Sequence, residues 1–255
     1  MILDMHCHTA EGSPDAVVTL EETIEKLREK GYNGMVVTDH NSYRGHNSLT
    51  KKYDDFVVLR GIEYDSFDGG HLLIILPTRI KYEIFEYRGM LTEDVIKIVH
   101  ALGGIVGPAH PFDYKGLGVC TTKLRTNIDL LSKFDFIETF NGCLDERGSL
   151  LSNYLASYLN KPCFGGSDSH SISKVGLVKT IIDYDIKNED DLITVVKKSK
   201  YKSFDISGGF YERKYKKIHT FGVFAGGCLY TAVNKCLSIN HRKRATAIFN
   251  ALGIK

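Results

Sequence analysis

Two histidines near the start of the chain, His6 and His8, are the first residues whose type and spacing suggest chemistry. They are separated by one residue and follow a short apolar run that begins at Ile2. Side chains of a strand alternate between its two faces, so on a strand both imidazoles point to the same side. Imidazole is the commonest metal ligand in proteins, and the pair therefore predicts a metal site. The alternative is two ordinary polar residues at the end of a strand.

Histidines and carboxylates recur at comparable positions along the chain. The residues at or just beyond the ends of expected strands are His6, His8, His40, Glu63, His110, Asp168 and His170. A parallel barrel builds its active site at this end of its strands, so we predict one cluster that binds metal. His71 differs because it opens its strand. Asp15 lies on a loop near the first pair, where it either completes a ligand set or acts as a helix cap or turn residue.

The elements that must position these residues follow from apolar patterning. Strands are expected over residues 2–5, 34–40, 56–62, 71–76, 104–109, 136–140, 162–166 and 178–182, and helices over 20–30, 92–102, 150–159 and 189–198. Strands that alternate with helices imply parallel crossovers. An α/β fold with a closed or nearly closed (β/α) barrel fits this pattern better than an open doubly wound sheet.

Composition bounds the class of protein. A chain of 255 residues with a net charge of +2 suits one large α/β domain with an appendage. The six cysteines are scattered without a Cys-x-x-Cys pair, which predicts reduced thiols in a cytoplasmic protein. No apolar run approaches the roughly 18 residues of a membrane span. The first residues also lack the basic start and apolar core of a signal peptide.

The excess positive charge lies in the last part of the chain. We expect a barrel domain over residues 1–200 and a basic, partly helical extension over 201–255 that packs on the barrel. Within the extension, residues 221–239 are expected to be helical in part, and a last helix is expected near 245–252. The alternative role for this extension is a surface that binds nucleic acid or an anionic membrane.

The ordered motifs resemble those of the PHP (polymerase and histidinol phosphatase) family of metal-dependent phosphoesterases. The matching stretches are His6-Cys-His8-Thr9, Thr38-Asp39-His40, Gly61-Ile-Glu63, His71, Gly107-Pro-Ala-His110-Pro111 and Gly166-Ser-Asp168-Ser-His170. The resemblance covers roughly residues 1–200. It implies a distorted (β/α)7 barrel, similar to a TIM barrel, that carries two or three divalent metal ions.

The resemblance also implies a ligand set for each ion. The first ion would be held by His6, His8, Glu63 and Asp168. The second would share Glu63 as a bridge and would be held by His71 and His110. The third would be held by Asp15, His40 and His170.

Histidine and carboxylate ligands without thiolates suit Zn, Mn or Fe, and a bridging carboxylate holds two ions close together. We therefore predict an enzyme, a metal-dependent phosphoesterase. It would hydrolyse a small phosphomonoester or a nucleotide by in-line attack of a metal-bridging hydroxide. The alternatives are a non-catalytic binding module that its metals stabilise and an amidohydrolase-like C–N hydrolase.

Two residues after the second expected strand are candidates for catalytic roles. Arg44 is expected to bind the phosphate, because a guanidinium group can contact two oxygens at once. His46 is expected to protonate the leaving group. Other cations on the same face are more typical of solvated charges: Lys115, Lys123, Arg125 and Lys174. Cys7 should point away from the metals and act as a small core residue.

Overall fold

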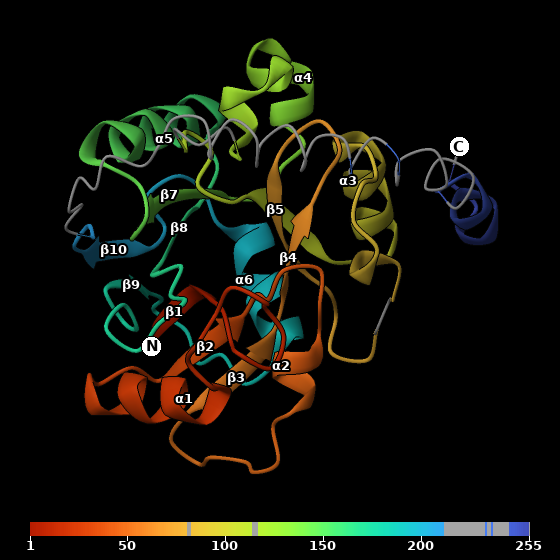
Figure 1. The fold of residues 1–255 in the computed structure, drawn as a ribbon. Coiled ribbons are helices and arrows are strands. Elements are labelled where there is room, and N and C mark those ends of the chain that lie inside the picture. The colour runs from red at the N-terminus through yellow and green to blue at the C-terminus, as the bar shows by residue number, and fades with distance from the viewer. Residues whose placement is uncertain (81–82, 114–116, 212–232, 234–235, 237–244, 255) are drawn as a thin grey trace.

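The computed structural model describes residues 1–80, 83–113, 117–211, 233, 236 and 245–254 (Figure 1). The strands are β1 (Ile2–Cys7), β2 (Gly34–Val37), β3 (Val57–Arg60), β4 (Ile62–Asp65), β5 (His71–Ile75), β6 (Ile105–Pro108), β7 (Ile137–Asn141), β8 (Cys163–Gly166), β9 (Val178–Ile181) and β10 (Asp205–Gly208). The α-helices are α1 (Leu20–Glu29), α2 (Arg44–Asn47), α3 (Thr92–Ala101), α4 (Ile128–Leu131), α5 (Glu146–Leu159) and α6 (Glu189–Lys198). The 3-10 helices are η1 (Glu83–Glu86), η2 (Val119–Thr121) and η3 (Lys123–Thr126).

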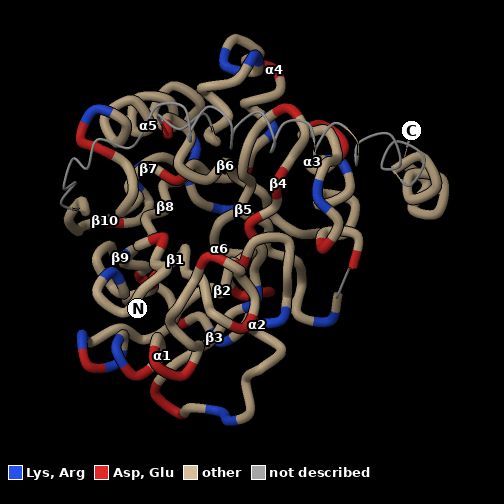
Figure 2. The backbone as a smooth tube through the Cα atoms, in the orientation of Figure 1, with Lys and Arg blue, Asp and Glu red and all other residues tan. Residues whose placement is uncertain are grey.

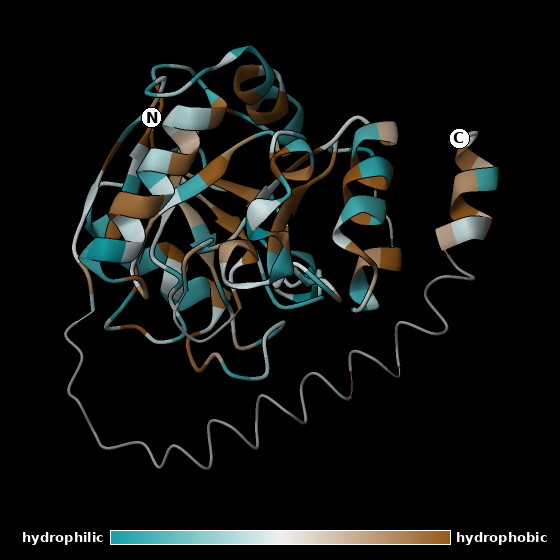
Figure 3. Cartoon of the chain, turned by 90° about the horizontal axis from the view of Figure 1, so that it is seen from above, coloured by the Kyte–Doolittle hydropathy of each residue, from teal (hydrophilic) through white to brown (hydrophobic). Residues whose placement is uncertain are grey.

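The fold is α/β, with apolar strands in the middle and amphipathic helices around them (Figure 3). The strands form three sheets, with the orders β10-β9-β1-β2-β3, β4-β5-β6 and β7-β8. β1 runs parallel to β2, but β9 runs antiparallel to β1, and β5 runs antiparallel to both β4 and β6. The expectation of parallel crossovers throughout is therefore wrong, and the described strands do not pair into one closed barrel.

The antiparallel strand β5 explains how His71 reaches the other predicted ligands. Residues 66–70 connect β4 to β5, and this loop is too short for the helical crossover that parallel strands need. In the resulting pairing, Asp65 at the end of β4 lies opposite His71 at the start of β5. The first residue of β5 therefore lies at the same edge as the last residue of β4.

Helix α1 has the composition of a helix that covers a core. Its cap, Thr19, accepts a hydrogen bond from the backbone N–H of Glu22, and the Glu22 carboxylate accepts one from the Thr19 N–H at 2.9 Å. Leu20, Ile24 and Leu27 are buried, as their spacing predicts. Charges of both signs lie along the outer side of α1 (Figure 2).

The single strand expected over residues 56–62 is two strands. β3 and β4 meet at Gly61, and they belong to different sheets. Gly61 passes close to a neighbouring strand: its N–H donates to the carbonyl of Val37 at 2.9 Å, and a Cβ here would lie 2.8 Å from a methyl group of Val36. Glu63 consequently lies within β4 and not beyond the end of a longer strand.

The part of the chain after residue 200 joins the first sheet. β10 pairs with β9, so the expected domain boundary falls before the last strand. Residues 245–252 are helical, as predicted. The helix expected over 221–239 lies outside the described residues, apart from positions 233 and 236. No helix in the described part of the chain is long and apolar enough to cross a membrane.

Gly166, at the end of β8, lies where the first and third sheets meet. The isolated bridge between Cys7 and Ser169 links these two sheets, and the Asp168 N–H donates to the carbonyl of His6 at 2.8 Å. A Cβ on Gly166 would lie 2.6 Å from the backbone nitrogen of His6 and 2.9 Å from its Cα. Only glycine permits this approach without displacing the strand that carries His6.

We expect Gly166→Ala to lower the free energy of unfolding by about 1–3 kcal/mol, because the added methyl group forces β1 and β8 apart. Urea unfolding of the variant measures this loss. Gly209→Ala is a matched control, since its Cβ would meet only the Leu177 side chain at an ordinary 3.4 Å. Equal stabilities for the two variants would contradict the predicted crowding at Gly166.

Candidate metal centre

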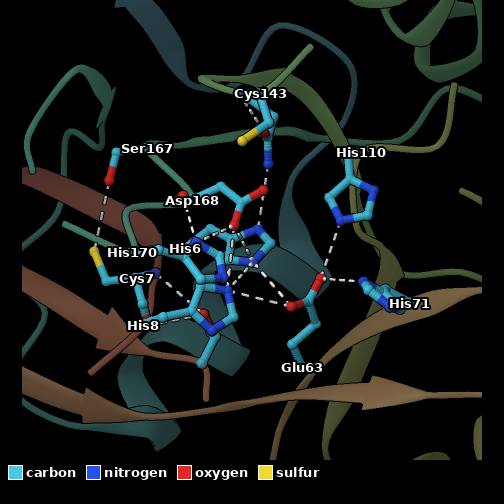
Figure 4. Close-up of polar contacts among 12 residues, drawn as sticks. His6, Cys7, His8, Glu63, His71, His110, Cys143, Ser167, Asp168 and His170 are labelled. Carbon is cyan, nitrogen blue, oxygen red and sulfur yellow. Dashed lines mark hydrogen bonds and ion pairs between the residues drawn. The ribbon is translucent and has the colours of Figure 1, made fainter. Parts of the chain in front are cut away.

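The predicted ligands converge on one buried cluster (Figure 4). They come from β1 and the residue after it (His6, His8), from β4 (Glu63), from the start of β5 (His71) and from the segments after β2, β6 and β8 (His40, His110, Asp168 and His170). The imidazole rings of His6 and His8 lie 5.1 Å apart, as alternation on a strand predicts. The structure thus brings together residues that are far apart in the sequence.

The ligand atoms of His6, His8 and Glu63 at the centre lie close enough to contact one ion, and Asp168 lies beside both histidines. A tetrahedral ion with ligand bonds of about 2.1 Å separates its ligand atoms by about 3.4 Å. The Nε2 atom of His6 lies 3.1 Å from Nε2 of His8, 3.5 Å from Oε2 of Glu63 and 3.7 Å from Oδ1 of Asp168. The Nε2 atom of His8 lies 3.2 Å from each of the same two carboxylate oxygens. The separations among His6, His8 and Glu63, and those from Asp168 to the two histidines, are thus close to the tetrahedral value.

Glu63 presents its two oxygens to different neighbours. Oε2 faces His6 and His8, and it lies 3.0 Å from Nδ1 of His40. Oε1 lies 2.9 Å from Nδ1 of His71 and 3.1 Å from Nε2 of His110. One carboxylate therefore connects two groups of nitrogen donors, which is the arrangement of a bridging ligand.

Asp15 lies beside the two remaining histidines. Its Oδ2 atom is 3.2 Å from Nε2 of His170 and 3.6 Å from Nε2 of His40. The Asp15 side chain is 56% exposed, whereas Glu63 is almost fully buried. His8 lies close enough to His40 and His170 for all three rings to contact one ion.

The charges of the cluster shift the ionisation of its members. Burial opposes the ionised form of Glu63, but the positive charges of His71, His40 and His6 hold its pKa well below the usual value. Burial likewise opposes ionisation of Asp168, but His6 and His8 hold the pKa of that carboxyl well below its usual value. Burial favours the neutral form of His71, yet the Glu63 carboxylate raises its pKa to about 9. A proton therefore occupies His71 at neutral pH in the absence of metal, and a divalent ion would displace it.

Several buried atoms of the cluster form no hydrogen bond within the described ranges: Glu63 Oε2, Asp65 Oδ1, His40 Nδ1 and His110 Nδ1. The first three have ion-pair partners nearby, but without the geometry of a hydrogen bond. A buried polar atom without a partner costs about 1–3 kcal/mol, so such atoms are rare in folded proteins. Nitrogen and oxygen donors of this kind suit Zn, Mn or Fe. The residues present therefore fit divalent ions.

A second layer of side chains orients the histidines, and sequence reasoning missed most of it. Glu138 on β7 is fully buried, and its Oε1 lies 2.9 Å from Nδ1 of His6. Its Oε2 accepts hydrogen bonds from the backbone N–H of His110 at 2.6 Å and from the side-chain amide of Asn141 at 3.1 Å. A carboxylate inside an apolar strand is a signal that could have identified Glu138.

Ser13 and Asp39 support His8 in the same way. The Ser13 hydroxyl lies 2.9 Å from Nδ1 of His8 and donates to Oδ1 of Asp39 at 3.0 Å. Asp39 Oδ1 also accepts a hydrogen bond from the backbone N–H of Thr9 at 2.6 Å. Asp39, which precedes His40, therefore acts on a ligand through Ser13 and does not contact the cluster directly.

Asp65 is a further carboxylate that sequence reasoning did not select. Its Oδ1 atom lies 3.3 Å from Nε2 of His71, while the other nitrogen of that ring faces Glu63. Its Oδ2 atom lies 3.1 Å from the guanidinium of Arg88. A carboxylate beside the outer nitrogen of a ligand histidine fixes the orientation of the ring.

We expect Glu138→Gln to weaken metal binding by about tenfold to a hundredfold, since outer partners of ligand histidines have effects of this size. The amide can no longer accept hydrogen bonds at both of its ends, so His6 loses its fixed orientation. Competition with a chelator measures the affinity. Glu146→Gln, at the start of α5, is the control on an exposed helix end, and unchanged affinity in Glu138→Gln would contradict the role of Glu138.

The cluster opens into a cavity of about 260 Å³. Its lining residues are Asp15, His40, Glu63, His71, His110, Asp113, Leu117, Cys143, Asp168, His170 and Lys174. Arg44 is exposed on α2, and His46 is half-buried on the same helix. Neither is among the described residues that line the cavity, so their expected roles in catalysis stay predictions. Cys7 is fully buried in an apolar cluster, which confirms its assignment to the core.

Family models match most of the chain. One, described as the PHP domain, matches residues 4–154, and another, described as PHP-associated, matches residues 150–201. No curated protein matches the chain.

Several solved structures are similar in fold. PsfC from Pseudomonas syringae PB-5123 aligns with a TM-score of 0.60 at 15% identity, over 91% of this chain and 98% of that one. A Bifidobacterium adolescentis protein described as a metal-dependent phosphoesterase aligns with a TM-score of 0.54 at 15% identity, over 77% and 96%. Endonuclease Q, in complex with a 27-mer duplex substrate with an abasic lesion at the active site, aligns with a TM-score of 0.55 at 19% identity, over 77% and 57%. At these identities the likeness concerns the fold.

Proposed function

The chain belongs to the PHP domain family of metal-dependent hydrolases, and from this membership we propose that it hydrolyses a phosphate ester at the cluster around Glu63. The observation that carries the proposal is the spacing of His6, His8 and Glu63, whose ligand atoms lie close enough to contact one ion, with Asp168 beside both histidines. The second oxygen of Glu63 faces another pair of histidines, which supports a site with more than one ion.

We propose that the chain's own residues divide into three groups. His6, His8 and Asp168 would hold one ion, His71 and His110 a second that Glu63 shares, and Asp15, His40 and His170 a third. Zn, Mn or Fe bound there would supply Lewis-acid activation of water and offset the charge of the phosphate. Glu138, Ser13 and Asp65 would keep the ligand rings oriented, and Leu117 would supply an apolar part of the wall.

The cavity supports a small substrate. Its volume of about 260 Å³ lies just below the range of roughly 300–1,000 Å³ that is typical for drug-sized ligands. We therefore propose a small phosphomonoester or the phosphate end of a nucleotide as the substrate. The likeness to Endonuclease Q makes a phosphodiester in a nucleic acid the second substrate class to test.

The three sheets are proposed to form one distorted barrel around this site. The isolated bridge between His40 and Glu63 links the first sheet to the second, and the bridge between Cys7 and Ser169 links the first to the third. The N–H of Asp135 donates to the carbonyl of Val106 at 2.8 Å and so connects the second sheet to the third. These links support a ring of strands with irregular joints.

The test is a substrate panel for the metal-reconstituted protein and for Asp168→Ala. The panel contains phosphomonoesters, nucleotides, phosphodiesters and cyclic amides, and phosphate and amine release are both measured. We expect phosphate release that Asp168→Ala reduces by about a hundredfold or more. Asp205→Ala, an exposed position on β10, is the matched control.

Other outcomes of the same panel identify the alternatives. Ring opening of a cyclic amide without phosphate release would indicate an amidohydrolase-like enzyme. Bound metal that raises the melting temperature without turnover of any substrate would indicate a binding module. Either result would contradict the phosphoesterase proposal.

A further inference from the structure

We propose that Lys174 and Tyr211 form an anion-binding subsite in the wall of the metal cavity, where the Lys174 ammonium contacts a non-bridging oxygen of the substrate's phosphoryl group. Lys174 is the binding residue and Tyr211 the positioning residue. The inference rests on the proposed function, because it names how the same site would hold its substrate. It also assigns a role in this site to the part of the chain after residue 200.

The wall of the cavity combines acidic side chains with the cationic side chain of Lys174. Four of its lining residues are acidic: Asp15, Glu63, Asp113 and Asp168. Within the described ranges, Lys174 is the one lysine or arginine that lines the cavity, and it forms no ion pair with an acidic side chain. Its positive charge is therefore available to an anion that enters the cavity, and a phosphate brings negative charge to this place.

The Lys174 ammonium lies over the aromatic ring of Tyr211. The Lys174 ammonium nitrogen lies 4.3 Å from the centre of the Tyr211 ring. A cation within about 6 Å of an aromatic face is attracted to it, and this contact leaves the charge of the lysine unneutralised. A lysine held in this way loses less conformational freedom when it binds an anion than a free lysine does.

Hydrogen bonds hold Tyr211 to the segments that follow β7 and β8. Tyr211 follows β10, and its backbone N–H donates to the carbonyl of Gly142 at 3.0 Å. Its hydroxyl donates to the carbonyl of Ser167 and lies 3.4 Å from the carbonyl of Asp168. Burial raises the pKa of Tyr211, which keeps the hydroxyl a neutral donor. Tyr211 thus fixes Lys174 to the loop that carries a proposed metal ligand.

The test measures binding of inorganic phosphate to the metal-loaded full chain by calorimetry. We expect Lys174→Ala to weaken binding by about tenfold to a hundredfold, the size expected for a hydrogen bond to a charged group. Lys174→Arg should retain most of the affinity. Tyr211→Leu should weaken binding by about tenfold, and Tyr211→Phe, which keeps the ring, should have a smaller effect. Lys179→Ala is the matched control, because Lys179 is half-buried on β9 and does not line the cavity.

A structural role would give a different pattern. It would lower the metal content and the melting temperature in every Lys174 and Tyr211 variant, and Lys174→Arg would behave as Lys174→Ala does. If the subsite is as proposed, the metal content of each variant stays that of the wild type. KM for a phosphomonoester then rises as the phosphate affinity of the variant falls. Either loss of metal in Lys174→Arg or unchanged phosphate binding in Lys174→Ala overturns the proposal.

Two outcomes separate this proposal from the proposed function. If the wild type binds phosphate through Lys174 but hydrolyses no phosphate ester, the function fails and the subsite stands. If the wild type hydrolyses esters and Lys174→Ala does so with the same KM, the subsite fails and the function stands. If Arg44→Ala weakens phosphate binding and Lys174→Ala does not, Arg44 and not Lys174 binds the phosphate. Absence of phosphate binding to the wild type would overturn the subsite.

Discussion

Glu63→Gln is expected to remove metal from two groups of ligands at once and to reduce phosphate release by at least about a thousandfold. Both oxygens of Glu63 are used, one by His71 and His110 and the other by His6 and His8. A glutamine amide keeps one oxygen and replaces the other by a group that only donates hydrogen bonds. Metal analysis of the purified variant and a turnover assay measure the two losses.

Asp168→Asn is the matched comparison for this variant. Asp168 Oδ1 lies 3.7 Å from Nε2 of His6 and 3.2 Å from Nε2 of His8, whereas His71 and His110 contact the other oxygen of Glu63. We therefore expect Asp168→Asn to lose the ion of the first group and to keep an ion at His71 and His110. Equal metal losses in the two variants would contradict the bridging role of Glu63. The melting temperature of each variant should be compared with that of the metal-free wild type, so that unfolding is not mistaken for loss of a ligand.

The metal-free protein is expected to lose stability as the pH rises from about 6.5 to 9. The pKa of His71 is about 9 in the folded chain, where Glu63 lies beside it, and 6.5 is the ordinary value that applies after unfolding. Because its pKa is raised in the folded chain, His71 adds to the free energy of unfolding, and this contribution is complete below pH 6.5. It is lost as the pH rises through 9. The difference between these two values corresponds to about 3 kcal/mol. The carboxylates around His6 raise its pKa as well, so it contributes in the same direction.

Urea unfolding at pH 6.5 and pH 9, with and without bound metal, measures this dependence. In the metal-loaded protein the ions replace the protons, so alkaline pH should leave its stability unchanged or increase it. Glu63 and Asp168 act at the acidic end, because the pKa of each is lowered and their contribution disappears only when strong acid protonates them. A metal-free protein that is equally stable at pH 6.5 and pH 9 would contradict the ionisation assigned to His71.

Some of the expected ligands came together because their positions in the sequence reflect local rules. Alternation along β1 placed His6 and His8 on one side. Asp168 and His170 follow the end of β8 at Gly166, and Asp168 has a positive φ of 51°, so irregular backbone and not strand alternation brings them to the cluster. Glu138 and Asp65 were not anticipated, since a single carboxylate in a strand gives no sign of which distant histidine it will meet. Their roles depend on the pairing between strands and not on spacing within one strand.

The fold was predicted best where a segment is long and periodic. Helix α6 has the bounds that its amphipathic pattern predicts, Glu189–Lys198. The direction of β5 was missed although Asp68-Gly69-Gly70 is a turn signal of hairpin length between two apolar runs. The glycine within the run is a local signal of a bend or a close approach at position 61, but which sheet each half joins depends on the neighbouring strand that it meets.

The partners of β1 have a consequence for how the protein acquires its metal during synthesis. His6 and His8 are made first, but Asp168 follows only after about 160 further residues, and β9, which pairs with β1, comes later still. At a synthesis rate of about 5–20 residues per second, His6 and His8 wait for Asp168 for roughly 8–32 seconds. A metal ion captured in that interval would meet an incomplete set of donors. Stable metal loading is thus expected only once the chain through β9 has left the ribosome.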